Sequence, residues 1–279
     1  MVIFLNGKFV PEERAVVSIF DRGFLYGDGL FEAVRIVNGQ PFQWSQHIER
    51  LQRGAEFLKI KLPFPEKSLR DFAKKLTAKN KMPDAILRLT LSRGIGARGY
   101  SPKNATRPTF TMSLHPARKI DFKNPPKWKL ITASFHIPAD EPLAQFKTCN
   151  KLLQVLARAE AEARGADEAL LLNIRGFVAE TTSSNLFWIE RNEICTPPVA
   201  AGILPGVTRA TILEICSKLK VSTRQKNIRP EKLPRANGVF LSLTSLGVVE
   251  VERLDGKILN RSPLARHIAR TYNEMLMRS

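Results

Sequence analysis

Cysteine and long apolar runs are both scarce in this chain of 279 residues. Its only cysteines are Cys149, Cys195 and Cys216, whose irregular spacing suits neither a disulfide framework nor a zinc site. We therefore expect reduced thiols that serve packing, and no metal. The longest apolar runs, such as residues 1–5, are far too short to span a membrane, and that run lacks the cationic start and small-residue cleavage site of a signal peptide. These absences predict a cytoplasmic protein with no membrane partner.

Acidic residues are also few. The chain has 44 Lys and Arg against 26 Asp and Glu, which gives a net charge of +18 and an isoelectric point near 10.2. Such a balance suits nucleic-acid binding, but the basic residues are dispersed and no segment resembles a recognition helix or an aromatic-basic sheet motif. We interpret the charge as a solvated basic surface that also attracts anionic substrates, and we expect no nucleic-acid partner.

The first part of the chain has the pattern of an α+β domain. Asn6-Gly7 and Asn38-Gly39 each lie between apolar runs, which is a strong hairpin signal. An amphipathic helix is expected between Ser45 and Leu58, with Ser45 as its N-cap and with Ile48, Leu51 and Phe57 on its buried side. Strands are expected at residues 85–92 and 108–114.

Two domains joined by a linker follow from the composition. The charged, proline-rich stretch 116–127 is typical of a linker, so we predict a small domain over 1–115 and a larger one over 128–279. The larger domain should contain many short strands, and helices near residues 149–165, 208–219 and 262–277.

Lys147 stands just before a helical run, Leu152 to Arg164, that stops at Gly165. Burial in a pocket would lower the pKa of this amine from about 10.4 and make it available for a Schiff base. A solvated lysine would have no such role. The position alone leaves both interpretations open.

Glu180 follows a strand, an Arg-Gly turn and a second short strand, and a polar turn and a third strand come after it. A carboxylate at the end of an apolar strand can keep a pyridine nitrogen protonated, which allows the ring to withdraw electrons from a carbanion. A solvated glutamate at a strand end is the alternative that this residue by itself leaves open.

The turn Gly206-Val207-Thr208 opens a further helical pattern. Its backbone N–H groups, its hydroxyl and the positive end of the helix dipole together suit a phosphate. An ordinary helix capped by threonine would have the same short signature.

Taken in order, these motifs resemble fold-type IV pyridoxal-phosphate enzymes, the class IV aminotransferases. The family comprises branched-chain and D-amino-acid transaminases and 4-amino-4-deoxychorismate lyases. The matching motifs cover nearly the whole chain: Asp21-Arg-Gly-Phe-Leu-Tyr26-Gly-Asp-Gly-Leu-Phe31-Glu32, His47-Ile-Glu-Arg50-Leu51, Lys147-x-x-Asn150, Gly176-x-Val-x-Glu180-x-x-x-x-Asn185, Gly202-Ile-Leu-Pro-Gly206-Val-Thr-Arg209 and Val239-Phe-Leu-Ser242-Leu-Thr244-Ser245. The resemblance implies a two-domain α+β fold like that of D-amino-acid aminotransferase, with pyridoxal 5'-phosphate at the domain interface.

The resemblance also implies roles for individual residues. Lys147 would form the Schiff base and move the substrate proton, and Glu180 would pair with the pyridinium nitrogen. The phosphate would be held by Arg50, Val207, Thr208 and Thr244. The larger domain, residues 128–279, would carry Lys147 as the Schiff-base lysine.

Substrate residues are implied by the same family. Tyr26 and Phe31 would shape the pocket, Ser245 would lie near the substrate, and Arg88 would face a substrate carboxylate. The loop with Arg98 and Tyr100 would reach the site of the neighbouring subunit, which implies a homodimer with active sites completed in trans.

Three functions remain open at the level of sequence. Transamination between an amino acid and a 2-oxo acid is favoured over the lyase that releases pyruvate to form 4-aminobenzoate, because Ala33 stands where many lyases carry a threonine. Arg98-Gly-Tyr100-Ser and the residues after Lys147 nevertheless resemble the lyases. Asn150 lies three residues after Lys147, which departs from the usual branched-chain spacing and leaves the substrate and its stereochemistry open. A non-enzymatic basic binding protein is the third alternative.

Overall fold

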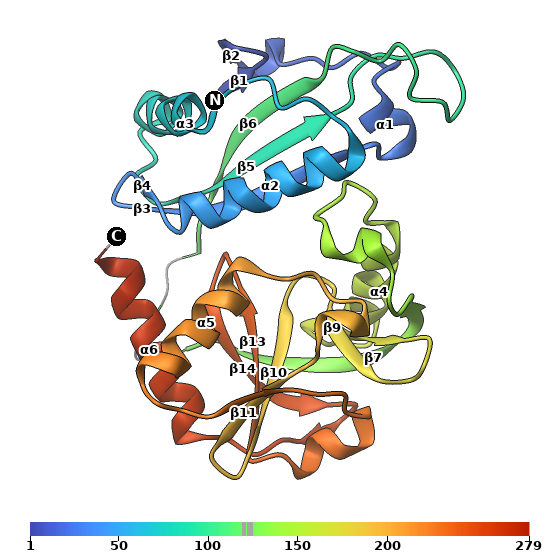
Figure 1. Cartoon of the computed structure of the whole chain (residues 1–279). Helices are drawn as coiled ribbons and strands as arrows, with labels where there is room; N and C mark the ends of the chain where they lie inside the picture. Colours follow the sequence, from blue (N-terminus) through green and yellow to red (C-terminus); the bar gives the residue numbers. More distant parts are fainter. Residues whose placement is uncertain (119–120, 122–124, 279) are drawn as a thin grey trace. The chain divides into compact units, whose positions relative to one another are not determined.

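The computed structural model describes residues 1–118, 121 and 125–278, which form two units (Figure 1). The first unit contains residues 1–118 together with Phe146–Asn150, and the second contains Lys119–Gln145 and Lys151–Arg278. The segment around Lys147 is thus grouped with the first unit, although the sequence analysis assigned it to the larger domain. Much of the predicted linker, residues 119–120 and 122–124, lies outside the described residues.

The first unit is a six-stranded sheet with the order β2-β1-β6-β5-β3-β4, covered by helices on one face. Its elements are β1 (Val2–Leu5), β2 (Lys8–Pro11), a 3-10 turn (Glu12–Arg14), α1 (Arg22–Tyr26), β3 (Gly29–Val37), β4 (Gln40–Pro41), α2 (Trp44–Leu58), α3 (Glu66–Asn80), β5 (Ala85–Ser92) and β6 (Thr109–Pro116). Both predicted hairpins are confirmed, because Asn6 and Asn38 each take a positive φ and precede a glycine in the left-handed region. The predicted strands correspond to β5 and β6.

Helix α2 confirms the predicted amphipathic helix but corrects two of its details. The helix starts at Trp44, after Gln43 in the left-handed conformation, and its first turn has no side-chain cap among the described residues. Ser45 lies inside the helix and donates to Glu66 Oε1 at 3.2 Å instead of capping it. Ile48 and Leu51 are buried as expected, whereas Phe57 is 49% exposed.

Helix α3 was not predicted. Leu69, Ala73 and Leu76 recur at helical spacing and are fully buried against the sheet. That spacing was the available signal, although the lysines between these residues make the segment strongly polar. Together α2 and α3 cover one face of the sheet.

The second unit is built on a nine-stranded sheet with the order β12-β11-β10-β13-β14-β7-β8-β9, in which β15 pairs with β14. Because β9 also pairs with β10, the strands from β10 to β9 close into a ring. The strands are β7 (Lys127–Ile137), β8 (Glu168–Asn173), β9 (Val178–Thr181), β10 (Asn185–Glu190), β11 (Glu193–Thr196), β12 (Thr223–Gln225), β13 (Gly238–Leu243), β14 (Gly247–Leu254) and β15 (Lys257–Ile258). The strand and turn pattern predicted around Glu180 corresponds to β8, β9 and β10.

The three predicted helices of this part are confirmed as α4 (Leu152–Ala163), α5 (Val207–Lys218) and α6 (Pro263–Met277). Short 3-10 turns lie at Pro142–Gln145, Val199–Ala201 and Pro230–Arg235. Cys195 and Cys216 are buried, and burial raises the pKa of each thiol to about 11. They therefore act as small packing residues, as expected. No helix within the described part of the chain is both long and apolar enough to cross a membrane.

Candidate active site

Lys147 is fixed in the first unit by pairing with β3. Phe31 N donates to Lys147 O at 2.9 Å, and Cys149 N donates to Gly29 O at 2.9 Å. The Lys147 side chain is half-buried, and its Nζ lies 4.8 Å from the centre of the Phe31 ring. These contacts explain why the Lys147 segment belongs to this unit.

Arg88 lies at the same aromatic ring. Its guanidinium carbon is 4.0 Å from the Phe31 ring centre, and in the sheet register Arg88 is opposite Ala33. Side chains alternate between the faces of a strand, so Phe31 and Ala33 share the face of β3 that is turned away from α2. The structure therefore brings Lys147, Phe31 and Arg88 together.

A buried charged cluster lies on the opposite face of β3. The Glu32 carboxylate is fully buried and accepts two hydrogen bonds of 2.7 Å from Arg50 and one of 2.8 Å from His47 Nδ1. Burial alone would raise the pKa of Glu32, but the charge of Arg50 and the hydrogen bonds from His47 and Arg50 outweigh it and lower the pKa to about 2. Arg50, predicted as a phosphate ligand, is thus anchored by a carboxylate.

His47 is the neutral member of this cluster. Burial lowers its pKa, and the charges of Arg50 and Lys147 lower it further against the opposing effect of Glu32. A neutral imidazole that donates from Nδ1 to Glu32 has Nε2 as an acceptor. The sequence analysis assigned no role to Glu32 or His47. A charged residue among the buried apolar positions of β3 was the signal for Glu32.

The loop that carries Arg98 and Tyr100 is held by α1. Arg22 is only 3% exposed and donates to the carbonyl oxygens of Gly99, Tyr100 and Ser101 at 2.8, 3.0 and 3.1 Å. Its Nε also donates to Asp28 at 2.8 Å. The backbone of this loop is therefore fixed, whereas the side chains of Arg98 and Tyr100 are exposed.

Tyr26 belongs to this loop contact. Its hydroxyl accepts from Gly99 N at 3.0 Å, and its ring centre lies 5.5 Å from that of Tyr100 in an edge-on arrangement. Helix α1 ends at Gly27, where a Cβ would come within 2.3 Å of Asn150 Oδ1. The C-terminal end of this short helix thus lies close both to the Arg98 loop and to the Lys147–Asn150 segment. Arg22 was missed because its contacts are made with distant backbone.

Glu180 is held within the second unit. Its Oε2 accepts from Leu204 N at 2.9 Å and from Asn185 Nδ2 at 3.2 Å, and Asn185 Nδ2 also donates to Leu204 O at 2.9 Å. These bonds fix the carboxylate against the segment that leads into α5.

Helix α5 begins at Val207, one residue after its N-cap Gly206, and no side chain among the described residues caps its first turn. Thr208 is buried in that turn. A Cβ on Gly206 would lie 2.1 Å from Asn185 Oδ1, so a side chain at this position would displace the Asn185 amide. The absence of a side-chain cap among the described residues excludes the interpretation of a helix capped by threonine and leaves N–H groups of the kind that suit an anion.

Hydroxyl groups follow on β13 and the turn after it. Thr244 and Ser245 are half-buried in the turn between β13 and β14. Ser242 pairs with Asn185 in the sheet register, is buried, and has an Oγ with no hydrogen-bond partner among the described residues. Predicted residues of this unit therefore lie on adjoining elements, because β10 pairs with β13 and α5 packs on β13.

The fold is that of the fold-type IV pyridoxal-phosphate enzymes. A branched-chain aminotransferase of Thermoproteus uzoniensis matches with a TM-score of 0.91 and 27% identity, covering 99% of this chain and 95% of the other. A 4-amino-4-deoxychorismate lyase of Pseudomonas aeruginosa matches with a TM-score of 0.86 and 28% identity, covering 99% of each chain. The two-domain α+β class predicted from sequence is thereby confirmed.

Sequence comparison gives the family. The model of "Amino-transferase class IV" matches residues 29–254. A Methanocaldococcus jannaschii protein provisionally named a branched-chain-amino-acid aminotransferase is 34% identical, covering 93% of this chain and 90% of its own. A D-alanine aminotransferase of Bacillus licheniformis is 31% identical, and the match covers 96% of this chain and 94% of the other. An aminodeoxychorismate lyase of Vibrio harveyi is 32% identical, and the match covers 90% of each chain. The chain belongs to the class IV aminotransferase family of enzymes, which excludes the non-enzymatic alternative.

Proposed function

We propose that the protein is a pyridoxal-phosphate-dependent aminotransferase that moves an amino group between an amino acid, of the D or branched-chain type, and a 2-oxo acid. The observation that carries this proposal is the group formed by Lys147, Phe31 and Arg88, with Ala33 beside it. An amine and a guanidinium on one aromatic ring suit a substrate that has a carboxylate next to its reacting carbon. Ala33 contributes no hydroxyl.

The residues of the chain fit the cofactor. In the second unit, the uncapped start of α5 and the hydroxyls of Thr208 and Thr244 suit its phosphate. The family resemblance adds Arg50 of the first unit, whose guanidinium is oriented by Glu32. Glu180 suits its ring nitrogen, because the carboxylate is held in one orientation. When bound, this cofactor supplies an electron sink next to the substrate's amino carbon.

The side chains of the protein then have distinct roles. Lys147 binds the cofactor and afterwards carries the proton that leaves and returns to the substrate carbon. Burial lowers the pKa of Arg88, but it stays cationic at neutral pH and orients the substrate carboxylate beside Phe31. Tyr26 and Ser245 shape the pocket, and Arg98 and Tyr100 contribute from the loop that Arg22 holds.

The test is a half-reaction without any acceptor. Incubating the yellow holoenzyme with L- and D-amino acids should bleach it with at least one of them and release the matching 2-oxo acid. Aminodeoxychorismate should give little pyruvate, and Ala33→Thr should increase that yield because the threonine hydroxyl can take part in proton transfer. Efficient pyruvate release by the unchanged protein, with no amino acid bleaching it, would assign it as the lyase instead.

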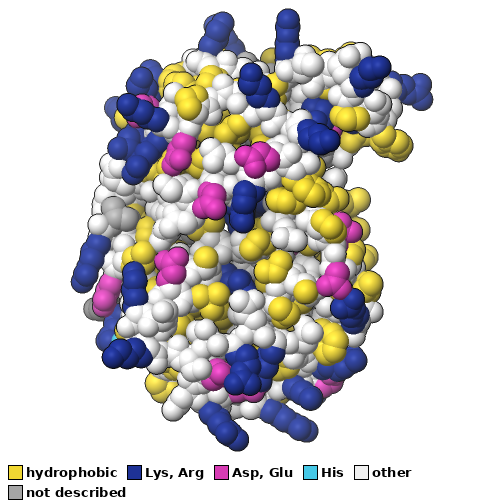
Figure 2. All heavy atoms as spheres, viewed as in Figure 1, with side chains coloured by type: hydrophobic (Ala, Val, Ile, Leu, Met, Phe, Trp, Pro, Cys, Tyr) yellow, Lys and Arg dark blue, Asp and Glu magenta, His cyan; other side chains and the backbone are white. Residues whose placement is uncertain are grey.

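We also propose that the protein is a homodimer in which the Arg98 loop completes the partner's site. Large apolar side chains are exposed near that loop, and Figure 2 shows hydrophobic side chains gathered near α1. The exposed large apolar residues before, within and after α1 and in the loop are Val16, Ile19, Phe20, Phe24, Ile95 and Tyr100. Such a patch suits a subunit interface. Mixing inactive Lys147→Ala and Arg98→Ala chains should restore part of the activity; a monomer at working concentration would contradict this.

A further inference from the structure

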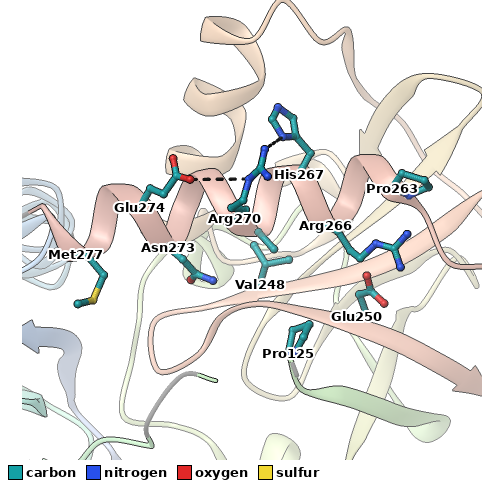
Figure 3. Close-up of a pocket in the computed structure, with 11 residues that line it drawn as sticks. Pro125, Val248, Glu250, Pro263, Arg266, His267, Arg270, Asn273, Glu274 and Met277 are labelled. Atoms are coloured by element: carbon teal, nitrogen blue, oxygen red, sulfur yellow. Dashed lines mark hydrogen bonds and ion pairs between the residues drawn. The ribbon is translucent and has the colours of Figure 1, made fainter. Parts of the chain in front are cut away.

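A cavity of about 730 Å³ lies in the second unit between α6 and β14 (Figure 3). Its size is in the range of small-molecule sites. None of the predicted cofactor or substrate residues lines it. Its walls are formed by Pro125, Val248, Glu250, Pro263, Arg266, His267, Ala269, Arg270, Asn273, Glu274 and Met277.

Two buried acceptors in these walls have no donor among the residues that the structure describes. Glu250 is 6% exposed; its Oε2 accepts from Arg261 at 3.2 Å, but its Oε1 has no hydrogen-bond partner in the described part of the chain. Asn273 Oδ1, which comes from α6, is likewise buried and without a partner there. Buried acceptors are nearly always satisfied in folded proteins. Two of them in one cavity indicate a ligand that donates hydrogen bonds.

The other residues that line the cavity indicate which chemical groups a ligand would carry. Arg266 is exposed, and among the described residues its side chain has no ion pair or hydrogen bond. Figure 3 shows it reaching from α6 in the direction of Glu250. Arg270, in contrast, is paired with Glu274 at 3.9 Å. Val248 and Met277 add apolar surface. The cavity thus combines two separate buried acceptors, of which Glu250 Oε1 lies on the Arg266 side, with a guanidinium and an apolar wall.

We propose that this cavity binds a free amino acid with an aliphatic side chain, at a site separate from the one that holds the substrate. The ammonium donates to Glu250 Oε1, and the carboxylate accepts from Arg266. The aliphatic side chain lies against Val248 and Met277. The inference rests on the cavity itself and stands whether or not the proposed reaction is correct.

The experiment is calorimetric titration of the full chain with matched probes. L-leucine is compared with 4-methylpentanoate, which lacks the ammonium, and with leucinamide, which lacks the carboxylate. Because leucine is also a candidate substrate, the protein is first treated with borohydride and pyridoxal 5'-phosphate, which blocks exchange at Lys147. We expect saturable binding of leucine, and affinities about tenfold weaker for both analogues, as the loss of one charge-assisted contact implies.

Variants then locate the site. Glu250→Gln and Arg266→Gln should each weaken leucine binding about tenfold while leaving turnover unchanged, and Arg266→Gln should have no effect on leucinamide. Glu274→Gln is the matched control, because Glu274 is exposed and paired with Arg270, and it should bind like the unchanged protein. Arg266 lies on an exposed helix surface, so its variant also tests the site if Glu250→Gln fails to fold. Leucine binding that both variants leave intact, or no binding at millimolar leucine, would overturn the proposal.

Discussion

The guanidinium of Arg50 donates two hydrogen bonds, each 2.7 Å long, to the carboxylate of Glu32 inside the first unit. Both side chains are buried. Arg50 comes from α2 and Glu32 from β3, so this ion pair links the helix to the strand whose backbone pairs with the Lys147 segment. A bidentate pair fixes the orientation of the guanidinium as well as its position.

Glu32→Gln should therefore destabilise the protein strongly. The substitution keeps the shape but leaves the buried charge of Arg50 without its counter-ion, which typically costs about 3–5 kcal/mol. Denaturant unfolding at pH 7 measures the loss. Glu49→Gln, at an exposed position on the same helix, is the control and should change stability little. Equal stabilities would show that the pair contributes nothing.

The Glu32 pair also predicts an acid limit. Its pKa is lowered to about 2, so its contribution is fully present above the ordinary carboxyl pKa of about 4.3 and is lost as the pH falls towards 2. The unchanged protein should lose stability on the order of 3 kcal/mol over that interval, and Glu32→Gln should not show this part of the loss. Unfolding curves between these pH values, compared for the two proteins, provide the test.

His47 predicts a second pH effect at milder acidity. Because its pKa is lowered in the folded protein, the unfolded chain takes up a proton first, and stability should fall as the pH drops below about 6.5. His47→Gln should flatten the stability profile just below that value. His267, exposed on α6, is the control position. A profile that His47→Gln leaves unchanged would contradict the assignment of a neutral His47.

Lys147→Ala should remove the yellow colour and reduce turnover by several orders of magnitude, because the covalent contact and the proton carrier are lost together. Phosphate contacts at α5 should still hold the cofactor non-covalently. Absorption spectra and peptide mapping after borohydride treatment identify the labelled residue. Normal turnover in Lys147→Ala would refute the catalytic assignment.

Arg22→Ala should loosen the Arg98 loop without touching Lys147. Three carbonyl contacts are lost, so we expect a higher KM with a smaller change in kcat, and faster tryptic cleavage after Arg98 or Lys103. Arg22→Lys should recover little, since one ammonium does not match the planar fork. Arg70→Ala, exposed on α3, is the control. Unchanged cleavage would show that Arg22 does not hold the loop.

Gly206→Ala should weaken cofactor binding. The new methyl would collide with Asn185 Oδ1 at 2.1 Å and displace the amide that supports Glu180. A loss of about tenfold or more in affinity for pyridoxal 5'-phosphate is expected from one disturbed charge-assisted contact. Ala210→Ser, at an exposed position of the same helix, serves as the control. Unchanged affinity would separate Gly206 from the cofactor.

Much of the local structure could be predicted from the sequence. Asn-Gly pairs fixed two hairpins because their backbone preferences are local, and the apolar periodicity gave α2, α4, α5 and α6. Helix α3 was not predicted, because the lysines between its few buried apolar residues make the apolar periodicity of the segment hard to recognise. The order of motifs around Lys147, Glu180 and Gly206 was enough to predict the family, since each motif is a local pattern.

Tertiary structure alone decided which distant groups meet. The partners of Arg50 and Arg22 are separated from them by many residues and include backbone carbonyls, which carry no side-chain signature. The grouping of Lys147 with the first unit arises from backbone pairing with β3. Glu250 Oε1 and Asn273 Oδ1 lack a hydrogen-bond donor among the described residues because β14 and α6 bury them in one cavity. Hydrogen bonding and burial depend on spatial neighbours, whereas a sequence directly specifies only neighbours along the chain.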